Sequence, residues 1–169
     1  MTAFVAGLLH PLLVPMHLMA IVALALLIGQ QMPRWGGNAS FSFDVAVTAG
    51  LLAIAFAYVP RLAQGSLLAA ATIAGLLAAL ARPLPEWLGI VVGAAIGLSL
   101  GLDSPPEALL VTDAHLTLIG TAFGAPMLLF GLVQIASRLR AHWQRIGARI
   151  LASWIAASAV LVLALRLLR

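Results

Sequence analysis

Apolar runs of about 20 residues follow one another along nearly the whole chain, separated by short stretches that carry proline, glycine or arginine. About 20 apolar residues are what a helix needs to cross the hydrocarbon core of a bilayer. Only 8% of the residues are charged, whereas about 25% are charged in a typical soluble domain. The sequence therefore predicts an integral membrane protein, an all-α bundle that uses residues 1–169 as one domain.

Six transmembrane helices are expected, and the breaks between them carry turn residues such as Pro33, Pro83 and Pro105. The division between the second and third helices rests on the few residues around Pro60, because a single span there would be too long. The expected helices cover residues 3–30, 43–62, 65–82, 86–102, 115–137 and 146–168.

Arginines predict the topology. With six spans, one side carries six of them, and the other side carries three arginines and three acidic residues. Loops rich in basic residues stay in the cytoplasm, so both termini are expected outside a multi-pass inner (cytoplasmic) membrane protein. Anionic lipid headgroups rather than nucleic acid account for the net charge of +4. The first side holds Arg34, Arg82, Arg138, Arg140, Arg145 and Arg149; the second holds Arg61, Arg166, Arg169, Asp103, Glu107 and Asp113.

Glycines recur at every fourth position of two expected helices, at Gly89, Gly93, Gly97 and Gly101 and again at Gly120 and Gly124. Small residues at this spacing let helix backbones approach closely in a membrane. Tight packing within one chain is the favoured interpretation, a homo-oligomer through the same faces is possible, and a glycine-lined conduit for a small permeant is the alternative.

Two histidines, His10 and His17, lie within the first apolar run. Seven residues are almost two helical turns, so both rings should project from nearly the same face. Ionisable side chains at membrane depth usually face the bundle interior or a wet cavity. A rise of 1.5 Å per residue predicts roughly 10 Å between the two residues, too far for one ion to bind both. They would then be successive stations for a metal ion, or each would need ligands from another helix. Pro15 should kink the helix between them; structural hydrogen bonding between helices is the alternative role.

Asp113 and His115 open the fifth expected helix on the same side as His10. Carboxylate and neutral imidazole both suit nickel, cobalt or zinc, so these residues are candidate further metal ligands. As alternatives, Asp113 would cap the helix and His115 would lie at the membrane interface. Asp44, at the start of the second helix, is a weaker candidate for a carboxylate on the exit side.

The segment His10-Pro11-Leu12-Leu13-Val14-Pro15-Met16-His17-Leu18-Met19-Ala20 resembles the first-helix signature of the HupE/UreJ family. That signature is His-Pro, a short spacer, then Asp-His followed by an apolar run. The resemblance implies a secondary permease for nickel or cobalt in which His10 and His17 handle the ion. The family's aspartate is Met16 in this chain, and its later histidine-and-glutamate motif has no counterpart here.

Other classes of function have less support. The chain has no cysteine, which excludes disulfides, thiolate metal sites and iron–sulfur clusters. No nucleophile elbow and no His-Glu-x-x-His motif occurs, so an enzyme is not expected. No tightly bound cofactor is expected, only a transported nickel or cobalt ion. The alternatives are a passive pore for a small solute and a membrane-embedded accessory subunit, with haem between His17 and His115 as its least favoured form.

Overall fold

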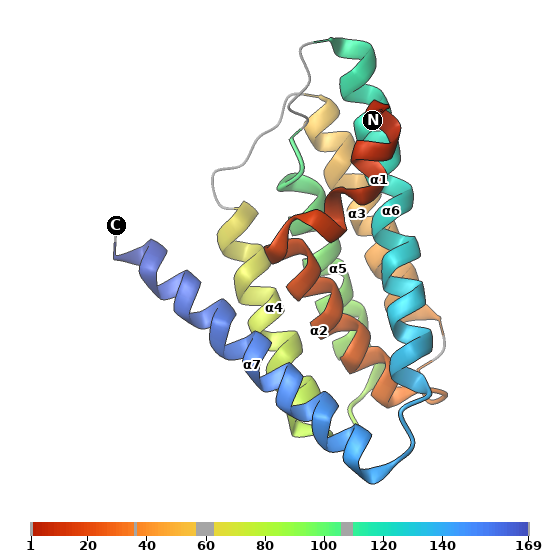
Figure 1. The fold of residues 1–169 in the computed structure, drawn as a ribbon, viewed down its shortest axis with the longest axis vertical. Coiled ribbons are helices and arrows are strands. Elements are labelled where there is room, and N and C mark those ends of the chain that lie inside the picture. The colour runs from red at the N-terminus through yellow and green to blue at the C-terminus, as the bar shows by residue number, and fades with distance from the viewer. Residues whose placement is uncertain (1, 36, 57–62, 106–109, 169) are drawn as a thin grey trace.

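The computed structural model describes residues 2–35, 37–56, 63–105 and 110–168, and every regular element in these ranges is an α-helix (Figure 1). The predicted all-α fold is confirmed for this part of the chain. Seven helices occur in it: α1 (Ala3–Leu13), α2 (Pro15–Gln31), α3 (Asn38–Ala55), α4 (Ala63–Leu80), α5 (Glu86–Leu102), α6 (Val111–Ser137) and α7 (His142–Leu167).

The helices have the length and hydropathy of a multi-pass membrane protein. Among the described residues, α3, α4, α6 and α7 are each long and apolar enough to cross a bilayer. α1 and α2 make a fifth candidate span if the two are counted together, although they are bent by 65° where they meet. α5 is equally apolar but shorter, with 17 residues. Four or five spans are therefore supported, and the count of six stays a prediction.

Several predicted helix boundaries were wrong. The first expected helix is two helices, because the chain becomes extended at Val14. α3 begins at Asn38, so Asp44 lies in its second turn. α6 begins at Val111, so Asp113 lies in the first turn and the N-cap position belongs to Leu110. The expected helix covered residues 115–137 with Asp113 as a candidate cap, whereas in the structure Asp113 lies inside the helix. A carboxylate is favourable in a first turn because it faces the positive end of the helix dipole. Three positions used in the sequence analysis lie outside the described residues: the predicted break at Pro60, and the topology residues Arg61 and Glu107.

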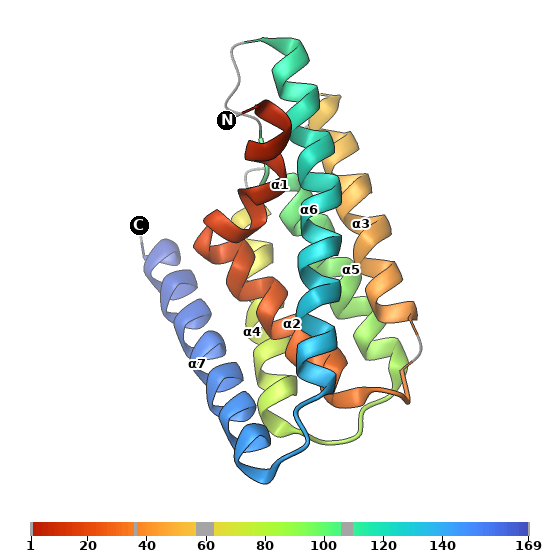
Figure 2. The same cartoon turned by 45° about the vertical axis from the view of Figure 1, so that its right-hand side comes forward.

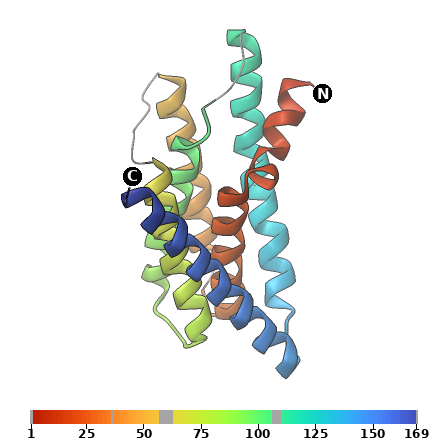
Figure 3. The same ribbon diagram turned by 60° about the vertical axis from the view of Figure 1, so that its left-hand side comes forward.

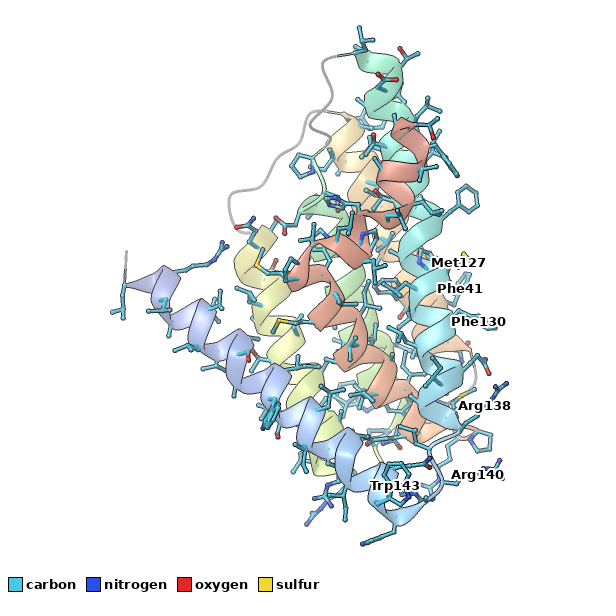
Figure 4. The ribbon with its side chains drawn as sticks, viewed as in Figure 1. Phe41, Met127, Phe130, Arg138, Arg140 and Trp143 are labelled. Carbon is cyan, nitrogen blue, oxygen red and sulfur yellow. The ribbon has the colours of Figure 1, made fainter. Side chains whose placement is uncertain are left out.

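α2 forms the centre of the molecule. Its residues from Ala20 to Gly29 are buried except for Val22, and the helix packs between α4 and α6 (Figure 2). The outward faces of α3 and α6 carry exposed large apolar side chains, including Phe41, Met127 and Phe130, which lie on one side of the molecule (Figure 4). An apolar outer surface around a buried helix is what a lipid-embedded bundle requires.

The glycine ladder of α5 lies against the backbone of α3. A Cβ atom placed on Gly93 would come within 2.6 Å of the Ala39 carbonyl oxygen, and one on Gly101 within 2.5 Å of the Val47 oxygen. Gly97 meets the Phe43 carbonyl in the same way. These contacts support the packing interpretation over a glycine-lined conduit, because the ladder is occupied by a neighbouring helix of the same chain.

α1 lies along α6, and the two helices run in the same direction (Figure 3). On α6, Gly120 contacts the α1 backbone at Phe4, and Gly124 contacts it at Leu8. Neither glycine therefore has room for a side chain. Thr121 donates a hydrogen bond from its hydroxyl to the Gly7 carbonyl at 3.1 Å. This close contact holds α1 away from the axis of α2.

Candidate metal centre

The break between α1 and α2 is built from local sequence. Val14 has φ −88° and ψ 111°, an extended conformation, and Pro15 is the first residue of α2. A residue before proline is pushed out of the helical region by the proline ring, and proline itself suits the first position of a helix. The predicted kink is therefore confirmed, as a 65° bend.

The bend brings the two imidazoles together. The ring centroids of His10 and His17 are 5.1 Å apart, with the ring planes inclined at 66°. The separation of roughly 10 Å that a continuous helix predicts was wrong, because that value holds only if α1 and α2 share one axis. The two rings therefore form one pair rather than two separate stations.

Asp103 adds a carboxylate to this pair. Its Oδ2 lies 3.1 Å from His17 Nε2, where the His17 side chain has no exposed surface and the Asp103 side chain is 9% exposed. Asp103 follows the last residue of α5 as its C-cap, and the neighbouring Ser104 hydroxyl donates to the Leu100 carbonyl at 2.7 Å. The end of α5 therefore places a carboxylate against the start of α2.

This contact determines how His17 can bind an ion. A carboxylate accepts a hydrogen bond, so in the neutral ring the proton belongs on Nε2 and the lone pair on Nδ1. His17 Nδ1 is buried and makes no hydrogen bond to the described residues. Histidines that bind metals commonly donate their second N–H to a carboxylate, which orients the ring and raises its basicity. The His17–Asp103 pair has this arrangement.

The other two candidate ligands lie elsewhere. His115 is exposed and Asp113 is half-buried, both near the start of α6. Leu8 touches Gly124, so His10 lies level with α6 residues beyond Gly124, and His115 is at least about 14 Å back along that helix. The structure does not bring these residues to the histidine pair, and their role as ligands stays a prediction.

The described residues contain no group of three or more histidine, cysteine, aspartate or glutamate side chains arranged to hold a metal ion. What they offer is a pair of imidazoles, one of them backed by a carboxylate. A pair of this kind would leave positions on an ion for water. Weak, incomplete coordination suits an ion that must be released again, whereas a structural site is usually closed by four protein ligands.

Asp103 is the residue that sequence reasoning missed. It stands in Asp103-Ser104-Pro105, which has the composition of a turn, and it was otherwise counted only among the acidic residues of the outer side. The available signal was its position, at the end of a span on the same expected side as His10. The remaining histidine, His142, is exposed at the first residue of α7.

The family model described as HupE / UreJ protein matches residues 1–163. No curated protein and no solved structure matches the chain.

Proposed function

The chain belongs to the HupE/UreJ family, and on this basis we propose that it is a membrane permease for a divalent transition-metal ion, nickel or cobalt. The family is associated with nickel and cobalt transport. In this proposal His10 and His17 bind the same ion transiently as it passes, in a multi-pass inner-membrane protein with both termini outside. The single observation that carries the proposal is the 5.1 Å distance between the two imidazole centroids at a break in the first span.

The distance fits a shared ion. Two imidazole nitrogens at about 2.1 Å from one ion, in neighbouring coordination positions, leave the ring centroids roughly 5 Å apart. Neutral imidazole suits nickel and cobalt, and their affinities for nitrogen ligands are high among first-row divalent ions. His17 would bind through Nδ1, since its Nε2 faces Asp103. His10, which is only half-buried, would meet the ion first.

Asp103 supplies the negative charge that the first span lacks. In the family signature an aspartate precedes the second histidine, and this chain has Met16 there. The Asp103 carboxylate reaches the same histidine from the end of α5. A carboxylate beside the site lowers the cost of bringing a dication into a low-dielectric interior. We propose that Asp103 orients His17 and balances part of the ion's charge, without binding the ion directly.

Asp113 and His115 stay candidates for an outer binding point, separate from the histidine pair. A passive pore has less support, because the glycines of α5 that suggested a conduit are packed against α3. A homo-oligomer stays a prediction from the sequence.

Uptake of radioactive nickel by proteoliposomes tests the proposal. Replacing both ligands, as His10→Ala with His17→Ala, should reduce the initial uptake rate by roughly tenfold or more, because no other imidazole lies beside the site. His142→Ala is the matched control and should transport like the wild type, since His142 is exposed on α7. Unchanged nickel and cobalt uptake by the double variant would contradict the assignment of the two histidines as ligands.

A further inference from the structure

A cavity lined by arginines lies towards the end of the molecule that is opposite the histidine pair. This cavity of about 500 Å³ opens where α2, α4 and α6 end and α7 begins. Figure 4 shows this end of the molecule, at the bottom of the view, with Arg140 labelled. From His17 to Gln30, which lines the cavity, the distance along α2 is about 20 Å. The arginines that line the cavity are Arg34, Arg82, Arg140, Arg145 and Arg149.

Among the described residues, nothing balances the charge in this cavity. None of the described residues in its lining is a carboxylate, and none of the five guanidinium groups forms an ion pair with a described acidic side chain. Arg149 donates from Nε to the Ala79 carbonyl at 3.0 Å, which satisfies one N–H but removes no charge. Guanidinium groups stay protonated at any physiological pH. All five residues are exposed, so water screens part of the repulsion between these like charges. An anion between them would relieve the repulsion that is left.

The cavity is also held in shape. Gln31 is buried and uses both ends of its amide on the connection between α4 and α5: Nε2 donates to the Arg82 carbonyl at 2.7 Å, and Oε1 accepts from Leu84 N at 3.3 Å. The indole of Trp35 donates to the Leu84 carbonyl at 3.0 Å. The backbone that carries Arg82 is thus fixed to the end of α2, so this part of the cavity lining is preformed.

One polar group in the lining has no partner. The side-chain Oε1 of Gln30 is buried and makes no hydrogen bond to the described residues. The two ends of an amide are assigned from their hydrogen bonds rather than observed, so the buried atom can equally be the NH₂ donor. An anion in the cavity would give this amide a hydrogen-bonding partner.

We propose that this cavity binds a phosphate-bearing anion. A phosphate presents several oxygens at once, so guanidinium groups from different chain segments can each donate to it, and arginine matches this geometry in a bidentate way. The same charge excludes a divalent cation from the cavity. Basic pockets between transmembrane helices hold phospholipid headgroups, and a free phosphate in solution has the same chemistry. The bound anion would connect the ends of α2, α4, α6 and α7.

Binding of two probes to the purified full-length protein in neutral detergent tests the proposal. The first probe is phosphatidylglycerol, compared with phosphatidylcholine, and native mass spectrometry counts the lipids retained per chain. The second probe is inorganic phosphate, compared with chloride at equal ionic strength, and the midpoint of thermal unfolding is measured. Saturable binding of phosphatidylglycerol alone would identify a lipid headgroup as the source, and binding of both probes would identify the phosphate group itself. Both outcomes support the site.

The variants make the test specific. Arg82→Gln with Arg145→Gln removes two cavity guanidiniums and should weaken binding by roughly tenfold or more, the usual loss for charge-assisted hydrogen bonds. Arg138→Gln with Arg166→Gln removes the same charge outside the cavity lining and should bind within about twofold of the wild type. Arg145→Gln alone, at an exposed position on α7, should give a smaller loss in a folded protein if the double variant fails to fold. Equal binding by the two double variants, or no binding of either probe by the wild type, would overturn the proposal. Neither result depends on metal transport.

Discussion

At the scale of single residues, the candidate site depends on two contacts: the one between the His10 and His17 rings, and the one between His17 and Asp103. His10 and His17 are unusual in an apolar run, and that was enough to select them. Their distance could not be predicted from spacing, because it depends on the conformation of Val14. Asp103 is 86 residues from His17 in sequence, and no local pattern connects them. The sequence could therefore suggest candidate ligands such as the two histidines, but it could not predict which side chains they contact.

The first residue-scale prediction concerns Asp103. Asp103→Asn keeps the size of the side chain but removes the negative charge beside His17. The amide can offer its oxygen or its NH₂ group to Nε2, so it fixes the ring proton less firmly than the carboxylate does. Replacing such a supporting carboxylate usually costs about 10- to 100-fold in metal affinity or activity. We expect a loss in this range in the dissociation constant for nickel, measured by calorimetry on the purified protein.

The matched control is Glu86→Gln, which makes the same change of charge at the start of α5, where Glu86 accepts a hydrogen bond from Asn38 in an exposed position. Glu86→Gln should bind nickel like the wild type. If Asp103→Asn also binds like the wild type, Asp103 has no part in the site.

At the scale of helices, the sequence predicted where apolar segments occur better than how they pair. The six expected segments all contain helix in the described residues, because hydropathy alone defines a span. The pairing of α1 with α6 joins segments more than 100 residues apart. Gly120 and Gly124 indicated a close helix contact, but many small residues on other helices gave the same signal. Only the structure shows which helix packs against each row of glycines.

The contact between α1 and α6 should be required for metal binding. A Cβ atom on Gly124 would collide with the backbone of α1 at Leu8, so Gly124→Ala should displace α1 and move His10 away from His17. We expect roughly tenfold weaker nickel binding, since a displacement of about 1 Å is enough to damage a coordination site. The measurement is the dissociation constant of the purified variant.

Gly131→Ala is the control on the same helix, because a Cβ there meets no atom within 4 Å. Alanine is about 1 kcal/mol better than glycine in a helix interior, so this variant should bind nickel normally and be at least as stable. Normal binding by Gly124→Ala would show that the site does not depend on how α1 packs.

At the scale of the whole molecule, the two ends of the bundle differ in charge. The arginine-lined cavity occupies one end, and the histidine pair with Asp103 lies towards the other. Arginine counting predicted this asymmetry, because it depends only on which breaks carry the basic residues. The cavity itself was not predicted: it needs Arg34 and Arg82, from two separate connections, and Arg145, from the start of α7, to line one place.

The predicted orientation can be tested by cysteine labelling, since the chain has no cysteine of its own. Gly37→Cys places a thiol at an exposed position near the arginine-rich end, where an added Cβ meets no atom. Thr112→Cys places one at an exposed position at the start of α6. With the arginine-rich end in the cytoplasm, an impermeant maleimide added to intact cells should label Thr112→Cys alone. Both should be labelled after permeabilisation, and the reverse pattern in intact cells would invert the topology.

The central claim is that His10 and His17 bind one ion together. X-ray absorption of the purified protein, loaded with less than one nickel ion per chain, counts the imidazole rings around the metal. Two imidazoles should lie at about 2.1 Å from each ion in the wild type, and one in either single alanine variant. A spectrum with no more than one imidazole per nickel in the wild type would contradict it, because the two rings would then not share an ion.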